Sequence, residues 1–377
     1  MRAVVMGAGI IGIACARELA LAGVDVTIVD RGGAAVATTA HGEGNILLSD
    51  KGPGPELRLA QLSRRLWPEM VDEATEWEPK GGIVVATTGP GARDLMDFAA
   101  AQRDAGVRAE ELDATALAAA EPHLTRDITA AVHYPEDAQV QPSGAATALL
   151  TGARRAGAVL RTGCEVRGAV TGKGRITAIR TSGGTLEADV FVNAAGPWAG
   201  ELSRRLGAPI DIRPRRGEIL VTTPLPPTVF HKVYDADYVG AIGSDAEELQ
   251  ASAVVESTRA GTILLGSSRR LVGFDDRLRA EVLSAIAARA LRLFPGLAGV
   301  PVMRAYGGFR PFVPDHLPVI GADHRLLGLW HATGHEGAGI GLSTGTGRLL
   351  ADLVTGRTPE IDAKPFRVDR PAVGGDR

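Results

Sequence analysis

Three glycines close to the N-terminus, Gly7, Gly9 and Gly12, form the pattern G-x-G-x-x-G. The apolar residues before them predict a buried parallel strand, and the unbroken stretch over 13–22 predicts a helix. In this pattern the first glycine permits a tight turn, the second lets the backbone approach a pyrophosphate, and the third lets helix and strand pack closely. The N–H groups at the helix N-terminus attract phosphate. The pattern therefore predicts a dinucleotide site.

A carboxylate stands at the end of the next predicted strand. Gly23 ends the helix, residues 25–30 predict a second strand, and Asp30 lies eighteen positions after Gly12. A carboxylate there accepts hydrogen bonds from an adenosine ribose and repels a 2′-phosphate. Strand, glycines, helix, strand and acid follow one another in the order of the βαβ fingerprint. We therefore predict a dinucleotide that lacks a 2′-phosphate.

A second glycine-rich helix start lies at the other end of the chain, over 334–341. It presents N–H groups and the positive end of a helix dipole to an anion. Small residues also end the apolar strand over 189–193, which lets more backbone reach the same ligand. Beyond the three glycines, the predicted cofactor-binding residues are Ile10, Ile11, Asp30, Arg31, Thr38, Thr39, His41, Gly42, Gly44, Asn45, Val166, Ala194, Ala195, Gly196, Trp198, Arg310, Gly334, His335, Gly337, Ala338, Gly339 and Ile340.

The composition excludes several classes of function. The net charge is −3 and aromatic residues make up 4%, which argues against a nucleic-acid partner. No apolar run is long enough to span a bilayer, and the N-terminus lacks the basic region of a signal peptide. The two cysteines and eight histidines show no metal-ligand spacing. We expect no metal and a cytoplasmic protein, with peripheral attachment to the inner membrane face left open.

The length of 377 residues and the order of the predicted elements indicate an α/β chain with two interleaved domains. We assign residues 1–78, 140–210 and 305–364 to the dinucleotide domain and 79–139 and 211–304 to a substrate domain. Strand candidates at 83–86, 218–222, 253–257 and 262–267 predict a largely antiparallel sheet in the substrate domain. An amphipathic pattern over 277–294 predicts a helix that packs on it. We expect Arg213, Arg215 and Arg216 at a solvated edge and a loose tail over 365–377.

Four segments in this order resemble one family closely. They are GAGIIG at 7–12 with Asp30, NAAGPWA at 193–199, GGFRPFVPDHLPVIG at 307–321, and GHEGAGIGLSTGTGRLLADL at 334–353. Together they resemble the FAD-dependent D-amino-acid oxidase and dehydrogenase superfamily, which includes glycine oxidase and sarcosine oxidase. The resemblance spans nearly the whole chain and implies a Rossmann-type FAD domain joined to a substrate domain.

The resemblance also implies a cofactor and a reaction. The cofactor would be FAD, with the C-terminal helix dipole beside the flavin pyrimidine ring, where negative charge develops on reduction. Arg310 would anchor the substrate carboxylate, because a planar fork suits bidentate binding. Either Tyr234 or Tyr238 could assist it, and we select Tyr238. Hydride would pass from Cα to flavin N5, and the resulting imine would hydrolyse in water. Orientation carries this reaction, so we name no catalytic base.

Within this superfamily, residues 253–274 are most similar to D-proline, hydroxyproline and opine dehydrogenase subunits. The expected substrate is therefore a small carboxylate-bearing amine, and D-proline or hydroxyproline is favoured. Several alternatives stay open. The chain could be the flavin subunit of a hetero-oligomeric dehydrogenase with little activity alone, or an NAD-dependent dehydrogenase that uses only the N-terminal fingerprint. His41 falls where some relatives bond a histidine covalently to the flavin, and the electron acceptor could be oxygen, a quinone or a partner protein.

Overall fold

The computed structural model describes residues 1–236 and 249–374. A six-stranded sheet forms one half of the molecule, and its strands run parallel except at the β18–β19 pair. Strand β1 is short and apolar because both of its faces are covered. In order across the sheet the strands are β18 (Val319–Ala322), β19 (Leu329–Thr333), β12 (Val190–Asn193), β1 (Arg2–Met6), β2 (Asp25–Val29) and β8 (Val159–Arg161).

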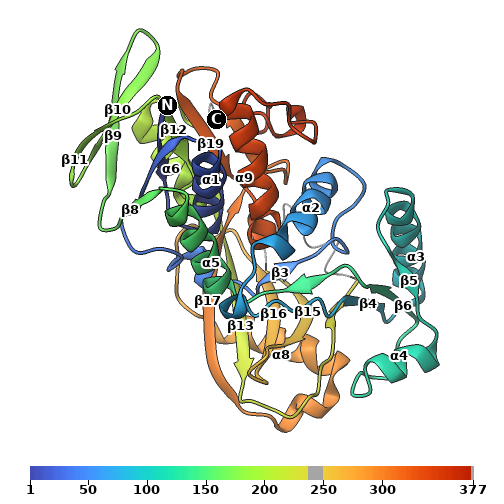
Figure 1. Cartoon of the computed structure of the whole chain (residues 1–377). Helices are drawn as coiled ribbons and strands as arrows, with labels where there is room; N and C mark the ends of the chain where they lie inside the picture. The colour runs from blue at the N-terminus through green and yellow to red at the C-terminus, as the bar shows by residue number, and fades with distance from the viewer. Residues whose placement is uncertain (237–248, 375–377) are drawn as a thin grey trace.

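Helices pack around helix α1 beside this sheet (Figure 1). Helix α1 is buried on nearly every side, because the sheet, α5 and α9 all contact it. Trp67, at the end of α2, joins this helix to α9 by donating its indole N–H to the carbonyl oxygen of Gly341, 3.1 Å away. The helices of this half are α1 (Ile10–Leu21), α2 (Pro55–Leu66), α5 (Pro142–Arg155), α6 (Ala199–Leu206) and α9 (Gly339–Thr355).

An eight-stranded sheet forms the other half, and only its β14–β4 pair is parallel among the described strands. The fold class is therefore the predicted one, a mixed α/β chain with a second, largely antiparallel sheet. The strands, in order, are β17 (Val302–Phe312), β13 (Arg213–Thr222), β16 (Ile263–Arg269), β15 (Gln250–Ser257), β14 (Lys232–Asp235), β4 (Gly82–Ala86), β6 (Ala130–Tyr134) and β5 (Glu110–Glu111).

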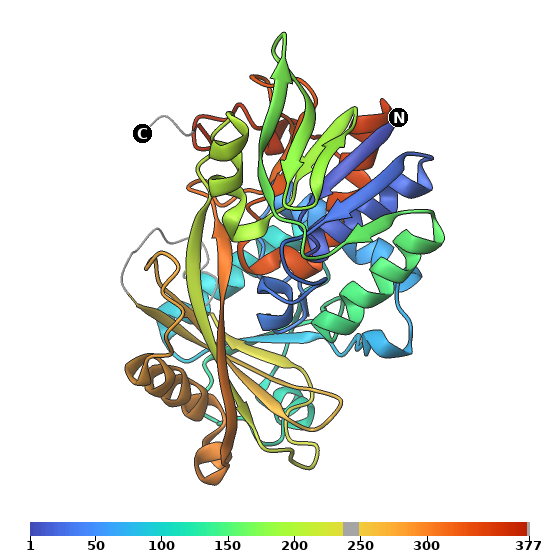
Figure 2. The same ribbon diagram turned by 90° about the vertical axis from the view of Figure 1, so that its left-hand side faces the viewer.

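The two faces of this second sheet bury different partners, as the two-residue period of a strand requires. Val233 and Val255 face helix α8 (Ala280–Leu293), which lies beneath the sheet in Figure 1. Tyr234 and Val254 point the other way and join the core of the first half. Figure 2 shows the long strands β13 and β17 running between the two halves. One face of the second sheet therefore lies against the glycine-rich turns of the first.

Smaller elements complete the chain. The predicted hairpin across residues 183–184 is present as β10–β11. The remaining strands are β3 (Asn45–Ile46), β7 (Ala138–Gln139), β9 (Val166–Gly172), β10 (Arg175–Thr181) and β11 (Gly184–Glu187). The remaining α-helices are α3 (Gly89–Asp104) and α4 (Ala114–Ala120), and the 3-10 helices are η1 (Thr38–His41), η2 (Trp67–Glu69), η3 (Glu73–Thr75), η4 (Gly196–Trp198), η5 (Pro295–Gly299), η6 (Glu336–Ala338) and η7 (Lys364–Phe366). No helix among the described residues is long and apolar enough to cross a membrane.

Three expectations about the chain need correction. The domain boundary at 304/305 falls inside β17, which pairs with β13 along its whole length and belongs to the second sheet. The C-terminal segment is not loose as far as residue 374, because Phe366 and Val373 are fully buried and Arg370 forms an ion pair with Asp315. The other predicted boundaries stay predictions.

The predicted solvated arginine edge is also wrong at two of its three positions. Arg215 and Arg216 are buried, whereas Arg213 is exposed. Each buried guanidinium has a carboxylate to compensate its charge, as burial of a cation requires. Arg215 pairs with Glu336 at 3.2 Å, and Glu218 lies 4.0 Å from Arg216. These arginines are part of the structure that supports the cavity described below.

The contact between α1 and α9 gives a first prediction. A Cβ on Gly347 would lie 2.6 Å from the Ala14 carbonyl oxygen, so Gly347→Ala must push the two helices apart. We expect the free energy of unfolding to fall by about 1–3 kcal/mol in a denaturant titration of the purified protein. Gly296→Ala is the matched control, because a Cβ there meets no atom within 4 Å. Equal stability of the two variants would contradict close packing at Gly347.

Candidate functional site

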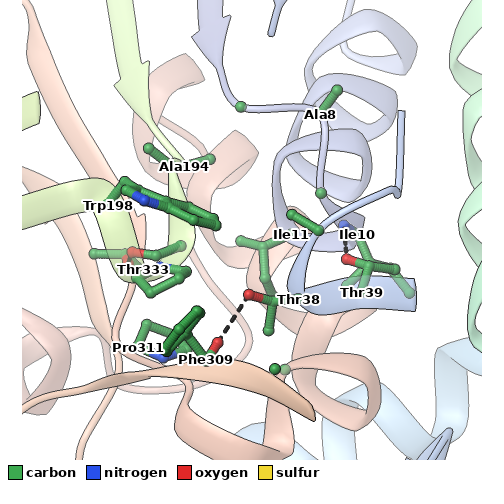
Figure 3. A pocket seen from close by; sticks show the side chains of 18 of the residues that line it. Ala8, Ile10, Ile11, Thr38, Thr39, Ala194, Trp198, Phe309, Pro311 and Thr333 are labelled. Carbon is green, nitrogen blue, oxygen red and sulfur yellow. Dashed lines mark hydrogen bonds between the residues drawn. The ribbon is translucent and has the colours of Figure 1, made fainter. Parts of the chain in front are cut away.

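A cavity lies where the glycine-rich turns of the first sheet meet strands β13 and β17. Figure 3 shows Trp198 and Pro311 on one side of this space and Ile11 and Thr38 on the other. The residues predicted from sequence to bind a cofactor that line it are Gly7, Gly9, Ile10, Ile11, Asp30, Arg31, Thr38, Thr39, His41, Gly42, Gly44, Asn45, Val166, Ala194, Ala195, Gly196, Trp198, Arg310, His335, Gly337, Gly339 and Ile340. The structure thus gathers segments from both ends of the chain around one space.

Three predicted residues do not line the cavity: Gly12, Gly334 and Ala338. Gly12 instead serves the packing that the fingerprint predicts, since a Cβ there would collide with the Gly7 carbonyl oxygen. Gly334 adopts a φ of +78° in the turn before α9, a conformation that favours glycine. Tyr238, predicted to assist Arg310, lies outside the described residues.

The first turn of α1 differs from the expected row of unpaired amides. The backbone N–H of Ile10 donates to Thr39 Oγ1 at 3.0 Å, as Figure 3 shows. Gly9, the residue just before the helix, has open space in front of it. A Cβ on Gly9 would meet only this hydroxyl, at 3.4 Å. The backbone at Gly9 is therefore bare toward the cavity, which leaves room there for a ligand to approach it.

Asp30 joins the end of β2 to the glycine turn. Its carboxylate accepts hydrogen bonds from the backbone N–H of Ala8 at 2.8 Å and of Gly32 at 2.7 Å. These bonds fix the carboxylate at the cavity wall, and each oxygen retains a lone pair for a further donor. Beside it, the Arg31 guanidinium lies over the Trp198 ring, 4.5 Å from the ring centroid.

The loop over 38–45 connects the two halves of the site. Thr38 Oγ1 donates to the Phe309 carbonyl oxygen on β17 at 2.8 Å. His41 Nδ1 donates to the Ala37 carbonyl oxygen at 2.8 Å, and its ring meets Tyr306 edge-on with 5.9 Å between centroids. Gly308 lies directly under His41, and a Cβ on this glycine would come within 2.9 Å of His41 Cβ. The loop can therefore lie flat on the second sheet.

His335, at the turn before α9, is a buried histidine with one nitrogen left over. Its Nε2 lies 2.9 Å from Thr346 Oγ1, whereas its Nδ1 has no hydrogen-bond partner among the described residues. Burial lowers the pKa of His335 to about 3, so the ring is neutral at physiological pH. A buried polar atom without a partner is costly, so a hydrogen bond from a bound group would stabilise this arrangement.

Arg310 reaches the cavity from near the C-terminal end of β17. Its Nη1 donates to the Ser268 carbonyl oxygen at 2.8 Å. The guanidinium lies across Gly217 on the neighbouring strand, where any Cβ would collide with it. Gly337 also lies next to the guanidinium, and a Cβ on this glycine would be 3.4 Å from Arg310 Nε. Gly217 thus clears the space for a cationic fork beside the cofactor cavity, whereas a Cβ on Gly337 would only touch it.

The sequence reasoning missed several lining residues, above all Glu43, Gly217 and Ile219. Glu43 stands between two glycines in a loop already assigned to the cofactor, and an acidic residue in such a loop is a usable signal. Gly217 interrupts a strand of otherwise large residues, which often marks a close approach to the backbone. The place of Gly217 beside Arg310 depends on the pairing of β13 with β17, which no local pattern reveals.

Comparison with known proteins gives a consistent result. Residues 2–353 match the sequence model of a family described as DAO: FAD dependent oxidoreductase. Glycine oxidase from Pseudomonas aeruginosa is 32% identical over 375 residues, which cover 97% of this chain and 98% of that protein. The crystal structure of glycine oxidase from Geobacillus kaustophilus is similar with a TM-score of 0.88 and 28% identity, covering 98% of this chain and 99% of that one. The chain spans about half, 52%, of the bifunctional protein ThiO/ThiG from Nostoc sp., to which it is 30% identical over 366 residues, or 93% of its own length.

The open space in front of Gly9 gives a second prediction. In Gly9→Ala the new Cβ meets only a hydroxyl within the protein, so the apoprotein should fold normally. The same Cβ would obstruct a pyrophosphate, so the dissociation constant for FAD should rise at least tenfold in a fluorescence titration of the apoprotein. Gly172→Ala, with no atom within 4 Å of its Cβ, should bind FAD as the parent does. Unchanged FAD affinity in Gly9→Ala would contradict the assignment.

Burial of His335 gives a third prediction, on the pH dependence of stability. The unfolded chain binds a proton on this ring below pH 6.5, whereas the folded chain does so only below about 3. The free energy of unfolding should therefore fall as pH decreases from 6.5 toward 3, by up to about 1.4 kcal/mol per pH unit from this residue. His335→Gln should make the decline shallower by that amount in urea titrations. The exposed control His324→Gln should keep the parent's slope, and an equal slope in His335→Gln would refute the argument.

Proposed function

The chain belongs to the DAO family of FAD-dependent oxidoreductases, and on that premise we propose that it oxidises the Cα–N bond of a small D-amino or imino acid. D-proline and hydroxyproline are the favoured substrates. The observation that carries the proposal is the placement of Arg310 beside the cofactor cavity, with its guanidinium over Gly217, where any Cβ would collide with it. A planar cationic fork in this position suits a substrate carboxylate.

Three features of the cavity fit FAD. Gly9 offers bare backbone at the start of α1, where a pyrophosphate would lie, and Asp30 stands at the end of β2, where a ribose would follow. His335 Nδ1 supplies a buried polar atom that needs a partner. The family match also decides against the NAD-dependent alternative, because the family uses FAD and because the match extends to residue 353, through the C-terminal glycine turn.

The proposed reaction depends on orientation by residues of this chain. When bound, FAD supplies the acceptor for the hydride that leaves Cα. Arg310 would hold the substrate carboxylate, and the bond from its Nη1 to the Ser268 carbonyl oxygen would fix the plane of the guanidinium. The N-terminus of α9 would stabilise negative charge that develops near it. Water would then hydrolyse the imine product to an oxo acid and ammonia or, for a cyclic imine such as that from proline, to one open-chain oxo acid that keeps the amine.

The favoured substrates follow from the similarity of residues 253–274 to D-proline, hydroxyproline and opine dehydrogenase subunits. A second candidate is a flavin subunit that works with partner chains and has little activity alone. Large apolar side chains exposed at or near β17, the edge strand of the second sheet, favour this second candidate, since partner subunits cover such surface. These are Leu278, Val302 and Met303, with exposures of 44%, 48% and 59%. Activity of the isolated chain would decide for the first candidate.

The anchor role of Arg310 gives a fourth prediction. Arg310→Ala should retain FAD but raise KM for amino-acid substrates about 100-fold, or ~2.7 kcal/mol, because the carboxylate loses its charged partner. Dye-linked steady-state assays with D-proline, D-alanine and glycine would measure this effect. Arg304→Ala is the matched control, since Arg304 lies on the same strand but is exposed and contacts the Tyr306 ring. An unchanged KM in Arg310→Ala would remove this residue from the role.

A further inference from the structure

Two side chains of opposite charge lie over two glycines of the second sheet. A Cβ on Gly217 of β13 would collide with Arg310 Nη1, and a Cβ on Gly266 of β16 would collide with Glu43 Oε1. Glu43 and Arg310 both line the cofactor cavity. They come from different elements, the 38–45 loop and β17, so their meeting over adjacent strands is a product of the tertiary fold.

Glu43 is a buried carboxylate with one oxygen left without a partner. Its side chain is 7% exposed. Oε2 accepts a hydrogen bond from Asn45 Nδ2 at 3.0 Å, whereas Oε1 has no hydrogen-bond partner among the described residues. Burial of a carboxylate oxygen in this state is costly, and a donor from a bound molecule would remove the cost.

The neighbouring lysine does not supply that donor. Lys232 Nζ donates to Asn45 Oδ1 at 2.6 Å and to Glu256 Oε2 at 3.0 Å, while Glu43 Oε2 lies 3.9 Å away. Two buried carboxylates therefore share one ammonium group, and Glu256 has the closer contact. The site around Glu43 is consequently suited to one more cationic or N–H group.

The register of the sheet sets the spacing between the two charges. Leu220 pairs with Leu265, so the next position along β13, Ile219, lies opposite Gly266. Gly217 is two residues further along and is thus a diagonal neighbour of Gly266, at about 7–8 Å. Arg310 Nη1 and Glu43 Oε1 occupy the Cβ positions of these two glycines, so the charged groups lie at a similar spacing. A carboxylate and an amine on one carbon can bridge it with a charge-assisted hydrogen bond at each end.

We propose that Glu43 binds the amino group of the substrate, so that an α-amino or imino acid lies across β13 and β16 between Glu43 and Arg310. This inference rests on the proposed function of the same cavity and adds the second recognition group. A carboxylate that lacks the amine would use only Arg310. An amine that lacks the carboxylate would use only Glu43.

The arrangement also assigns a proton acceptor. An amino acid binds in its zwitterionic form, and the Glu43 carboxylate takes one proton from the ammonium group, so that an N–H bond breaks and an O–H bond forms. The amine then has the lone pair that oxidation of the Cα–N bond requires. The titratable and charged groups around Glu43 are Lys232 of β14, Glu256 of β15, Tyr306 and Arg304 of β17 and His41 of its own loop.

The test compares matched ligands on the FAD-loaded protein. D-proline is paired with tetrahydrofuran-2-carboxylate, which has oxygen in place of the ring nitrogen, and glycine is paired with acetate. Dissociation constants come from changes in the visible absorbance of the flavin, or from the concentration dependence of its anaerobic reduction. Glu43→Gln should weaken binding of the two amino acids about 30-fold and change binding of the two simple carboxylates less than about threefold. Arg310→Lys should weaken both classes.

Two further variants separate recognition from general structural damage. Glu256→Gln is the control, because it removes a carboxylate from the same buried cluster although Glu256 does not line the cavity. The ratio of the affinity for amino acids to the affinity for simple carboxylates should stay within about fivefold of the parent's. Glu43→Asp should restore part of the preference for amino acids. In Glu43→Gln, kcat/KM should also rise tenfold per pH unit below the pKa of the substrate amine, because only the neutral amine binds productively.

Equal weakening of amino acids and simple carboxylates in Glu43→Gln, or no weakening of either, would overturn the inference. The proposed function is read separately, from reduction of the flavin in the parent protein. If amino acids reduce the flavin equally well with and without the Glu43 carboxylate, the proposed function is supported and Glu43 has no role in binding the amine. If amino-acid binding depends on Glu43 but no amino acid reduces the flavin, the recognition site is supported and the proposed reaction is wrong.

Discussion

The structure depends on close contact between backbones at positions where a Cβ atom has no room. Gly7 lies against the Ala194 carbonyl group, Gly12 lies against Gly7, and Gly347 lies against Ala14. These contacts hold β1, β12, α1 and α9 together, although they are drawn from both ends of the chain. Because the glycines bring the elements so close, the starts of α1 and α9 face one cavity, and both helix dipoles can act on one cofactor.

A second group of glycines performs the opposite task and keeps space open. Gly217, Gly266 and Gly308 lie on three adjacent strands, and each is covered by a polar or charged side chain of the site. Arg310, Glu43 and His41 occupy the space that Cβ atoms would otherwise fill. The second sheet thus provides a surface on which charges of both signs lie over adjacent strands, as the proposed binding of an amino acid between them requires.

Much of this site could be predicted from the sequence, and the failures have physical causes. The fingerprint glycines, Asp30 and the C-terminal turn are local patterns whose geometry follows from residue type, and they predicted a dinucleotide. The family match confirms the FAD cofactor that the resemblance to a known family implied. The burial of Arg215 and the position of Glu43 depend on strand pairing and on ion pairs between distant segments, such as Arg215 with Glu336. Local hydropathy marks an arginine as exposed and contains no information on such partners.

The central claim is that this cavity holds FAD against an amino acid bound by its two charged ends. The most direct measurement is the visible spectrum of the purified protein before and after anaerobic addition of D-proline, D-alanine and glycine. The account predicts a flavin spectrum that at least one of these amino acids bleaches, while the matching carboxylates without an amine leave the oxidised band in place. A flavin that none of them bleaches, or a protein that does not bind FAD, would contradict it.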